Sequence, residues 1–169
     1  MKAENVIGPV AIVEKPERTY VGIRLRTPFP GMFAVATKGL KQLRAWSRAN
    51  GVADDGPYLL RYYHCDMSQI MEIEAGFVTD HAPTGSSGIE RALLPGGKYA
   101  SLNYRGNGLR ANQALMQWAR DTGTAFEASD PALRESYASR YEAYLTDYRI
   151  EPRKLLWDVE LSIRIADQS

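Results

Sequence analysis

The hydrophobic pattern of this 169-residue chain changes period in the same order twice. Each time an alternating, strand-like segment is followed by a segment with helical spacing and then by two more alternating segments. The first set spans 19–25, 33–50, 58–63 and 71–78, and the second spans 98–104, 109–122, 141–145 and 155–165. The chain is therefore predicted to contain two successive βαββ units. We expect one domain over 1–169, with halves at about 10–82 and 89–165 separated by a loop at 81–88.

Both helical segments are apolar on one face only. Leu43 and Trp46 mark that face in the first helix, and Leu115 and Trp118 mark it in the second. Antiparallel strands with few helices predict an α+β fold, with the helices covering one side of the sheets. The other side is then left to meet solvent, a partner or a ligand.

Charge and composition limit the function classes. With 21 basic and 20 acidic residues the formal net charge is +1, so the electrostatic signature of a dedicated nucleic-acid binder is missing. No helix-turn-helix is predicted, and we expect no direct contact with nucleic acid. The single cysteine, Cys65, fits a reducing compartment. No segment approaches the roughly 18 apolar residues of a membrane span. We expect a cytoplasmic protein without membrane contact.

Strand alternation predicts which side chains point away from the helices. It assigns three tyrosines and two glutamates to that uncovered face: Tyr20, Tyr99, Tyr144, Glu142 and Glu160. Aromatic rings and carboxylates attract organic cations, and an apolar wall favours a carboxyl group as general acid or base. The ten tyrosines, against four phenylalanines, suit a wet cleft because their rings are amphipathic. The alternative is an exposed sheet face with solvated glutamates and hydrated tyrosines.

Other motifs are weaker. Residues 106–111 fit the G-x-G-x-x-A pattern of dinucleotide sites, but the predicted strands are not in parallel βαβ order, which favours a glycine-rich turn. The chain contains no H-x-x-x-H, C-x-x-C or G-x-S-x-G motif. No metal ion and no cofactor are predicted.

Several segments together resemble the GyrI-like small-molecule-binding domain family. They are EIEAGF at 72–77, LPGGKYA at 94–100, YRG at 104–106, YEAYLTD at 141–147 and WDVELSI at 157–163. The resemblance runs from about residue 10 to residue 165 and rests on the order and spacing of these segments.

The resemblance implies a pseudo-twofold pair of βαββ modules with a ligand cleft between the sheets, and we expect this cleft on the side away from the helices. Family members joined to DNA-binding domains sense effectors for transcription regulators, including multidrug-sensing ones. Stand-alone members include a gyrase-inhibiting protein and hydrolases of cyclopropane-bearing natural products. The family pocket has aromatic residues around a glutamate. Glu142 and Tyr144 match its E-x-Y motif, and Glu160 matches the acidic position of the last strand.

The chain departs from the family pattern at three places. Gly108 stands where the family often has an aromatic residue, and Ala166 stands where it often has a proline. The segment 124–140 looks longer than usual and is expected to reshape one wall of the cleft. A short helix is predicted to start in it at Asp130 and Pro131.

We therefore expect a stand-alone protein that captures a medium-sized aromatic or cationic ligand. Tyr20, Tyr99 and Tyr144 would stack on it, and Glu142 or Glu160 would supply negative charge. A first alternative is a hydrolase of strained electrophiles, with Glu142, Tyr144 and Glu160 as candidate catalytic residues and a glutamate as general base. A second is a protein that binds gyrase or a regulator as its partner.

Overall fold

The computed structural model describes residues 5–54, 56–81 and 88–167. Within them, nine strands form one antiparallel sheet in the order β1-β7-β9-β8-β4-β5-β3-β6, and β2 also pairs with β7. The first six strands are β1 Val6–Ile7, β2 Ala11–Lys15, β3 Arg18–Thr27, β4 Tyr58–His64, β5 Met71–Val78 and β6 Ile89–Leu94. The other three are β7 Gly97–Arg105, β8 Arg140–Tyr144 and β9 Val159–Arg164. The helices are α1 Met32–Ala49, α2 Gly108–Thr122 and the short 3-10 helix η1 Lys154–Leu156.

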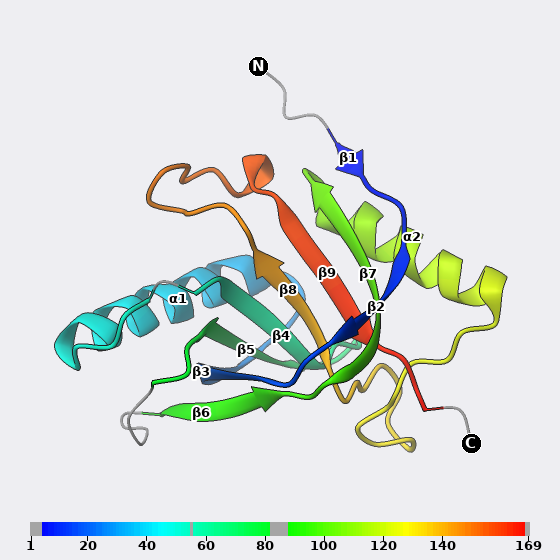
Figure 1. Cartoon of the computed structure of the whole chain (residues 1–169), viewed down its shortest axis with the longest axis horizontal. Helices are drawn as coiled ribbons and strands as arrows, with labels where there is room; N and C mark the ends of the chain where they lie inside the picture. The colour runs from blue at the N-terminus through cyan, green and yellow to red at the C-terminus, as the bar shows by residue number, and fades with distance from the viewer. Residues whose placement is uncertain (1–4, 55, 82–87, 168–169) are drawn as a thin grey trace.

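The predicted α+β class and the repeated βαββ order are confirmed. The first unit is β3-α1-β4-β5 and the second is β7-α2-β8-β9. The two units join where β4 pairs with β8, from Tyr58 opposite Tyr144 to Arg61 opposite Tyr141. Both units thus contribute to one continuous sheet, and α1 and α2 lie well apart (Figure 1).

Three strands and one irregular segment differ from the predictions. β1, β2 and β6 were not predicted; β1 and β2 lie along the outer edge of β7, and β6 forms the other edge beside β3. The last strand begins only at Val159, because the residues before it form η1 and Trp157 donates its ring N–H to the backbone oxygen of Glu151. At Asp130 a turn replaces the predicted helix. Of the predicted loop at 81–88, residues 82–87 lie outside the described residues.

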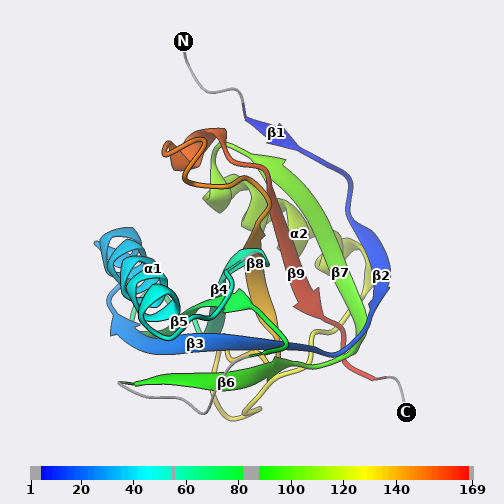
Figure 2. The same cartoon turned by 60° about the vertical axis from the view of Figure 1, so that its left-hand side comes forward.

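Each face of the sheet carries a hydrophobic core. Its helix side carries the larger core, which includes Leu43 and Leu115 from the two helices. The opposite side carries a second core, formed by Tyr20, Leu59, Val78, Leu94, Tyr99, Tyr141 and Ala143. Figure 2 shows that β3 and β6 run almost across the direction of β7 and β9. The sheet therefore bends, and residues from both βαββ units meet in the second core. Part of the face expected to be open is therefore packed, whereas Arg24, Arg26 and Glu72 remain exposed on it, at the other end of β3 and β5.

Candidate functional site

A cavity of about 900 Å³ lies on the helix side of the sheet, between α1 and α2. This placement corrects the expected one, which put the cleft on the face without helices. The apolar part of the wall consists of Phe29, Met32, Phe33, Leu60, Met67, Met71, Leu109 and Met116. The polar part includes Tyr62, Cys65, Tyr104, Asn112, Glu135, Arg140, Glu142, Tyr144 and Lys154.

The cavity exists because the two helices cover only the flanks of the sheet. α1 packs on β3 and β5, and α2 packs on β7, whereas the middle strands β8 and β4 lie between them. Alternation along β8 points Arg140, Glu142 and Tyr144 into this gap, and all three line the cavity. The polar residues of β8 thus face the cavity rather than a helix.

Glu142 is the buried carboxylate of this site, with only 5% of its surface exposed. Its two oxygens accept hydrogen bonds from two tyrosines: Tyr62 donates to Oε1 at 2.9 Å, and Tyr104 donates to Oε2 at 2.5 Å. A buried carboxylate needs such donors, because burying a charge without hydrogen-bond partners costs on the order of several kcal/mol. The arrangement holds a negative charge at a defined point of the cavity floor.

Three tyrosine hydroxyls near Glu142 remain protonated over a wide pH range. Burial, followed by the nearby charge of Glu142, raises the pKa of Tyr62 and of Tyr104. The same two causes raise the pKa of Tyr144. Tyr144 packs edge-on against Trp157, with ring centroids 5.2 Å apart, and its hydroxyl makes no hydrogen bond within the described residues. Tyr62 and Tyr104 therefore act as hydrogen-bond donors and not as bases, and the rings of all three tyrosines form an aromatic part of the wall.

Arg140 occupies another part of the cavity wall. Its guanidinium donates to Oδ1 of Asn112 at 2.6 Å, and Glu135 lies 3.8 Å from it. The same group contacts the sulfur of Cys65 at 3.6 Å. Burial raises the pKa of the Cys65 thiol, and Arg140 opposes this only in part. Glu135 belongs to the segment 124–140, which therefore forms part of one cavity wall.

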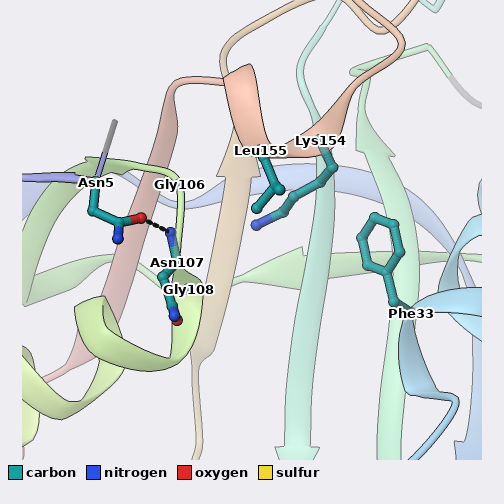
Figure 3. A pocket seen from close by; sticks show the side chains of 7 residues that line it. All are labelled: Asn5, Phe33, Gly106, Asn107, Gly108, Lys154 and Leu155. Atoms are coloured by element: carbon teal, nitrogen blue, oxygen red, sulfur yellow. Dashed lines mark hydrogen bonds between the residues drawn. The ribbon is translucent and has the colours of Figure 1, made fainter. Parts of the chain in front are cut away.

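A smaller hollow of about 630 Å³ adjoins the cavity and shares Phe33, Gly108 and Lys154 with it. Figure 3 shows Lys154 extending into this hollow from the connection between β8 and β9, with the turn at Gly106–Gly108 on one side and Phe33 on the other. The Lys154 ammonium donates to the hydroxyl of Tyr104 at 3.1 Å. The glycine-rich turn, which matched a dinucleotide pattern in the sequence, is thus a wall of the hollow at the start of α2.

The structure separates the five predicted site residues into two groups. Glu142 and Tyr144 line the cavity. Tyr20 and Tyr99 belong to the second core on the other face and are fully buried. Glu160 also lies on that other face, where its carboxylate pairs with Lys15 at 2.6 Å.

The cleft was expected on the wrong face of the sheet because of how polarity divides the side chains of β8. Polarity predicts that the more apolar set, Tyr141 and Ala143, lies on the helix side, like the apolar sets of the other strands. In the structure these two residues pack in the second core. Because both faces of β8 are buried, polarity did not show which of them meets the helices.

Two residues that contact Glu142 directly were missed. Tyr62 and Tyr104 lie on the helix side with Leu60 and Leu102, as alternation requires, and a tyrosine there looked like a core residue. The signal that could have identified them is that each tyrosine lies on the same side of its strand as apolar neighbours. Lys154 and Arg140 had no such signal, because only the tertiary structure brings them to the cavity.

Within the part of the chain that the structure describes, no three or more histidine, cysteine or acidic side chains are arranged to hold a metal ion. The site instead combines an apolar, concave wall with a few convergent polar groups, which is the usual composition of a site for a small organic molecule. The fold and cavity together define the class of α+β small-molecule-binding domains.

The profile of the GyrI-like small molecule binding domain matches residues 8–166, and the chain belongs to this family. No curated protein sequence matches the chain.

Solved structures with the same fold include two of EcmrR. Its C-terminal domain is 20% identical, with a TM-score of 0.66, and the match covers 95% of this chain and 99% of that one. The EcmrR chain in a complex with DNA is 18% identical, with a TM-score of 0.68, and the match covers 95% of this chain but only 58% of that one. A third structure, SAV2435 bound to tetraphenylphosphonium, is 11% identical, with a TM-score of 0.56 and 94% of both chains covered.

These similarities establish the fold. The DNA complex of EcmrR does not support the exclusion of nucleic acid that was predicted from charge. Among the described residues, no helix has both the length and the apolar character that crossing a membrane requires.

Proposed function

We propose that this domain binds a medium-sized, aromatic organic cation in the cavity between α1 and α2, with Glu142 as its counter-charge. The observation that carries the proposal is the buried carboxylate of Glu142, which two tyrosines hold in place inside a largely apolar cavity. A carboxylate in such surroundings attracts a cation more strongly than one in water does. The aromatic rings around it add cation–π attraction.

The size and composition of the cavity support the same ligand class. A volume of about 900 Å³ lies within the usual range for drug-sized ligands. Four of the five methionines line it, at positions 32, 67, 71 and 116. Flexible, polarisable methionine side chains adapt to ligands of different shapes. The wall therefore favours a class of hydrophobic molecules over a single tightly fitted one.

A structural relative supports the choice of cation. SAV2435 has been solved with tetraphenylphosphonium, an aromatic monocation without hydrogen-bonding groups. A ligand of this kind relies on shape, apolar contact and charge, which are the properties that the cavity wall offers.

The hydrolase reading stays a prediction. Glu142 and Tyr144 share the cavity, but each Glu142 oxygen already accepts a tyrosine hydrogen bond. Glu160 lies on the opposite face of the sheet, paired with Lys15.

The test compares two identical substitutions on opposite faces of the sheet. Glu142→Gln removes the cavity carboxylate, whereas Glu160→Gln makes the same chemical change away from the cavity. Tetraphenylphosphonium binding is measured by isothermal titration calorimetry on both variants and on the wild type. We expect Glu142→Gln to weaken binding by about tenfold or more, as removing one member of a buried charge pair does, and Glu160→Gln to leave it unchanged.

The results that contradict the proposal are specific. No binding of tetraphenylphosphonium to the wild type would overturn the assignment of ligand class. Equal binding by Glu142→Gln and the wild type would remove Glu142 from the site. Circular dichroism and thermal unfolding show whether each variant is folded before its affinity is compared.

A further inference from the structure

We infer that Lys154 is a specificity-determining residue. Its ammonium balances the charge of Glu142, and a cationic ligand must compete with it for that carboxylate. This inference deepens the proposed function and rests on it. It concerns a residue that sequence reasoning did not single out, and it predicts opposite effects on ligands of opposite charge.

The geometry links Lys154 to the carboxylate through one tyrosine. The Lys154 ammonium donates to the Tyr104 hydroxyl at 3.1 Å, and the same hydroxyl donates to Glu142 at 2.5 Å. The positive and negative charges are thus two hydrogen bonds apart. Lys154 Nζ also lies 5.1 Å from the centroid of the Tyr104 ring.

Among the described residues, no other charged group pairs with Lys154. In the described residues, no carboxylate lies within ion-pair distance of its ammonium. Neighbouring basic residues of the same connection are paired differently, Arg149 with Asp147 and Arg153 with Glu151. Lys154 is half-buried and points into the hollow instead (Figure 3).

Gly108 makes room for this arrangement. A Cβ atom at Gly108 would lie 2.8 Å from the Tyr104 hydroxyl and 3.7 Å from Lys154 Nζ. A side chain at this first residue of α2 would therefore push against the hydroxyl that joins Lys154 to Glu142. With glycine, the lysine lies at the common boundary of the cavity and the smaller hollow.

The consequence for binding follows from Coulomb's law. A cation near Glu142 meets repulsion from Lys154, whereas an anion of the same shape is attracted by it. The lysine stem is flexible and half-exposed, so the ammonium can turn toward solvent as a ligand enters. Lys154 therefore lowers affinity for cations without closing the cavity, and it favours ligands that carry an acceptor or a negative group beside a cationic one.

The experiment uses two probes of nearly equal size and opposite charge, tetraphenylphosphonium and tetraphenylborate. Their affinities are measured by isothermal titration calorimetry for the wild type, Lys154→Met and Lys154→Arg. Lys41→Met, at an exposed site on α1, is the matched control. For Lys154→Met we expect tetraphenylphosphonium to bind about tenfold more tightly and tetraphenylborate about tenfold more weakly, as a unit charge about 6 Å away predicts at intermediate effective dielectric. Lys154→Arg and Lys41→Met should retain the wild-type ratio of the two affinities.

The outcomes separate this inference from the proposed function. If tetraphenylphosphonium binds in a Glu142-dependent way and Lys154→Met changes neither affinity, the inference fails and the proposed function stands. If both affinities change in the same direction, the effect comes from the methionine side chain and not from charge, which also overturns it. If the wild type binds neither probe, the proposed function fails and takes this inference with it.

Discussion

Replacing Tyr20 with phenylalanine tests whether the second face of the sheet is a core or a ligand surface. The Tyr20 hydroxyl donates to the buried carboxylate of Glu74 and accepts a hydrogen bond from the guanidinium of Arg61 at 2.8 Å. Arg61 also donates to the backbone oxygens of Leu93 and Ala138, each at 2.7 Å. The hydroxyl therefore lies between two buried charged groups, of which Arg61 links β4 to β6 and to the segment before β8.

The expected cost follows from these contacts. A hydrogen bond to a charged group contributes about 1.5–3 kcal/mol, and Tyr20→Phe removes two of them. The loss is partly offset because Glu74 still accepts from Tyr63 at 2.8 Å and Arg61 keeps its two backbone acceptors. We expect the free energy of unfolding to fall by about 2–4 kcal/mol. In a domain of this size that corresponds to a decrease in Tm of roughly 5–15 °C.

The assay is urea unfolding followed by tyrosine and tryptophan fluorescence, with tetraphenylphosphonium binding measured in parallel. Tyr144→Phe is the control, because its ring is also buried but its hydroxyl makes no hydrogen bond in the described structure. This control should change stability by less than about 1 kcal/mol. A Tyr20→Phe protein with wild-type stability but weakened ligand binding would refute the assignment of Tyr20 to the core.

Two further predictions concern backbone packing and the cavity thiol. Gly76→Ala should destabilise the protein by about 1–3 kcal/mol in urea unfolding, because a Cβ there would lie 2.7 Å from the backbone oxygen of Val21 and 2.9 Å from the Tyr20 ring; an unchanged midpoint would contradict the tight strand packing. Cys65 should react with iodoacetamide at pH 7.5 more slowly than glutathione does, because burial raises the thiol pKa and leaves less thiolate at that pH, and the rate should increase with rising pH. Bound tetraphenylphosphonium should slow the reaction further, and a rate equal to that of glutathione would place Cys65 outside the cavity wall.

Local patterns in the sequence were enough to predict most of the secondary structure. β5 was predicted at its observed bounds, α2 begins one residue earlier than predicted, and α1 both begins and ends one residue earlier than predicted. These elements are determined by short-range periodicity and by helix ends such as Gly123, whose positive φ of 69° ends α2. The edge strand β6 was missed because its sequence, IERALL, has little apolar alternation to mark it.

The candidate site was predictable in kind but only partly in its members. The sequence by itself indicated a glutamate among tyrosines, with Glu142 and Tyr144 as members, and the cavity contains both. The tyrosines that hold the carboxylate are Tyr62 and Tyr104, whereas Tyr20 lies in the second core.

Alternation divides the side chains of each strand into two sets, but it does not state which set meets the helices. In a sheet with one wet face, polarity answers that question. In this protein the sheet bends and both faces of β8 are buried, and the apolar residues of β8 point away from the helices while its polar residues face the gap between them. The sequence therefore determined the elements of the two βαββ units, their order and the chemical character of a site. Only the tertiary structure decided which face holds the cavity, because that depends on the bend of the whole sheet and on where two helices leave it uncovered.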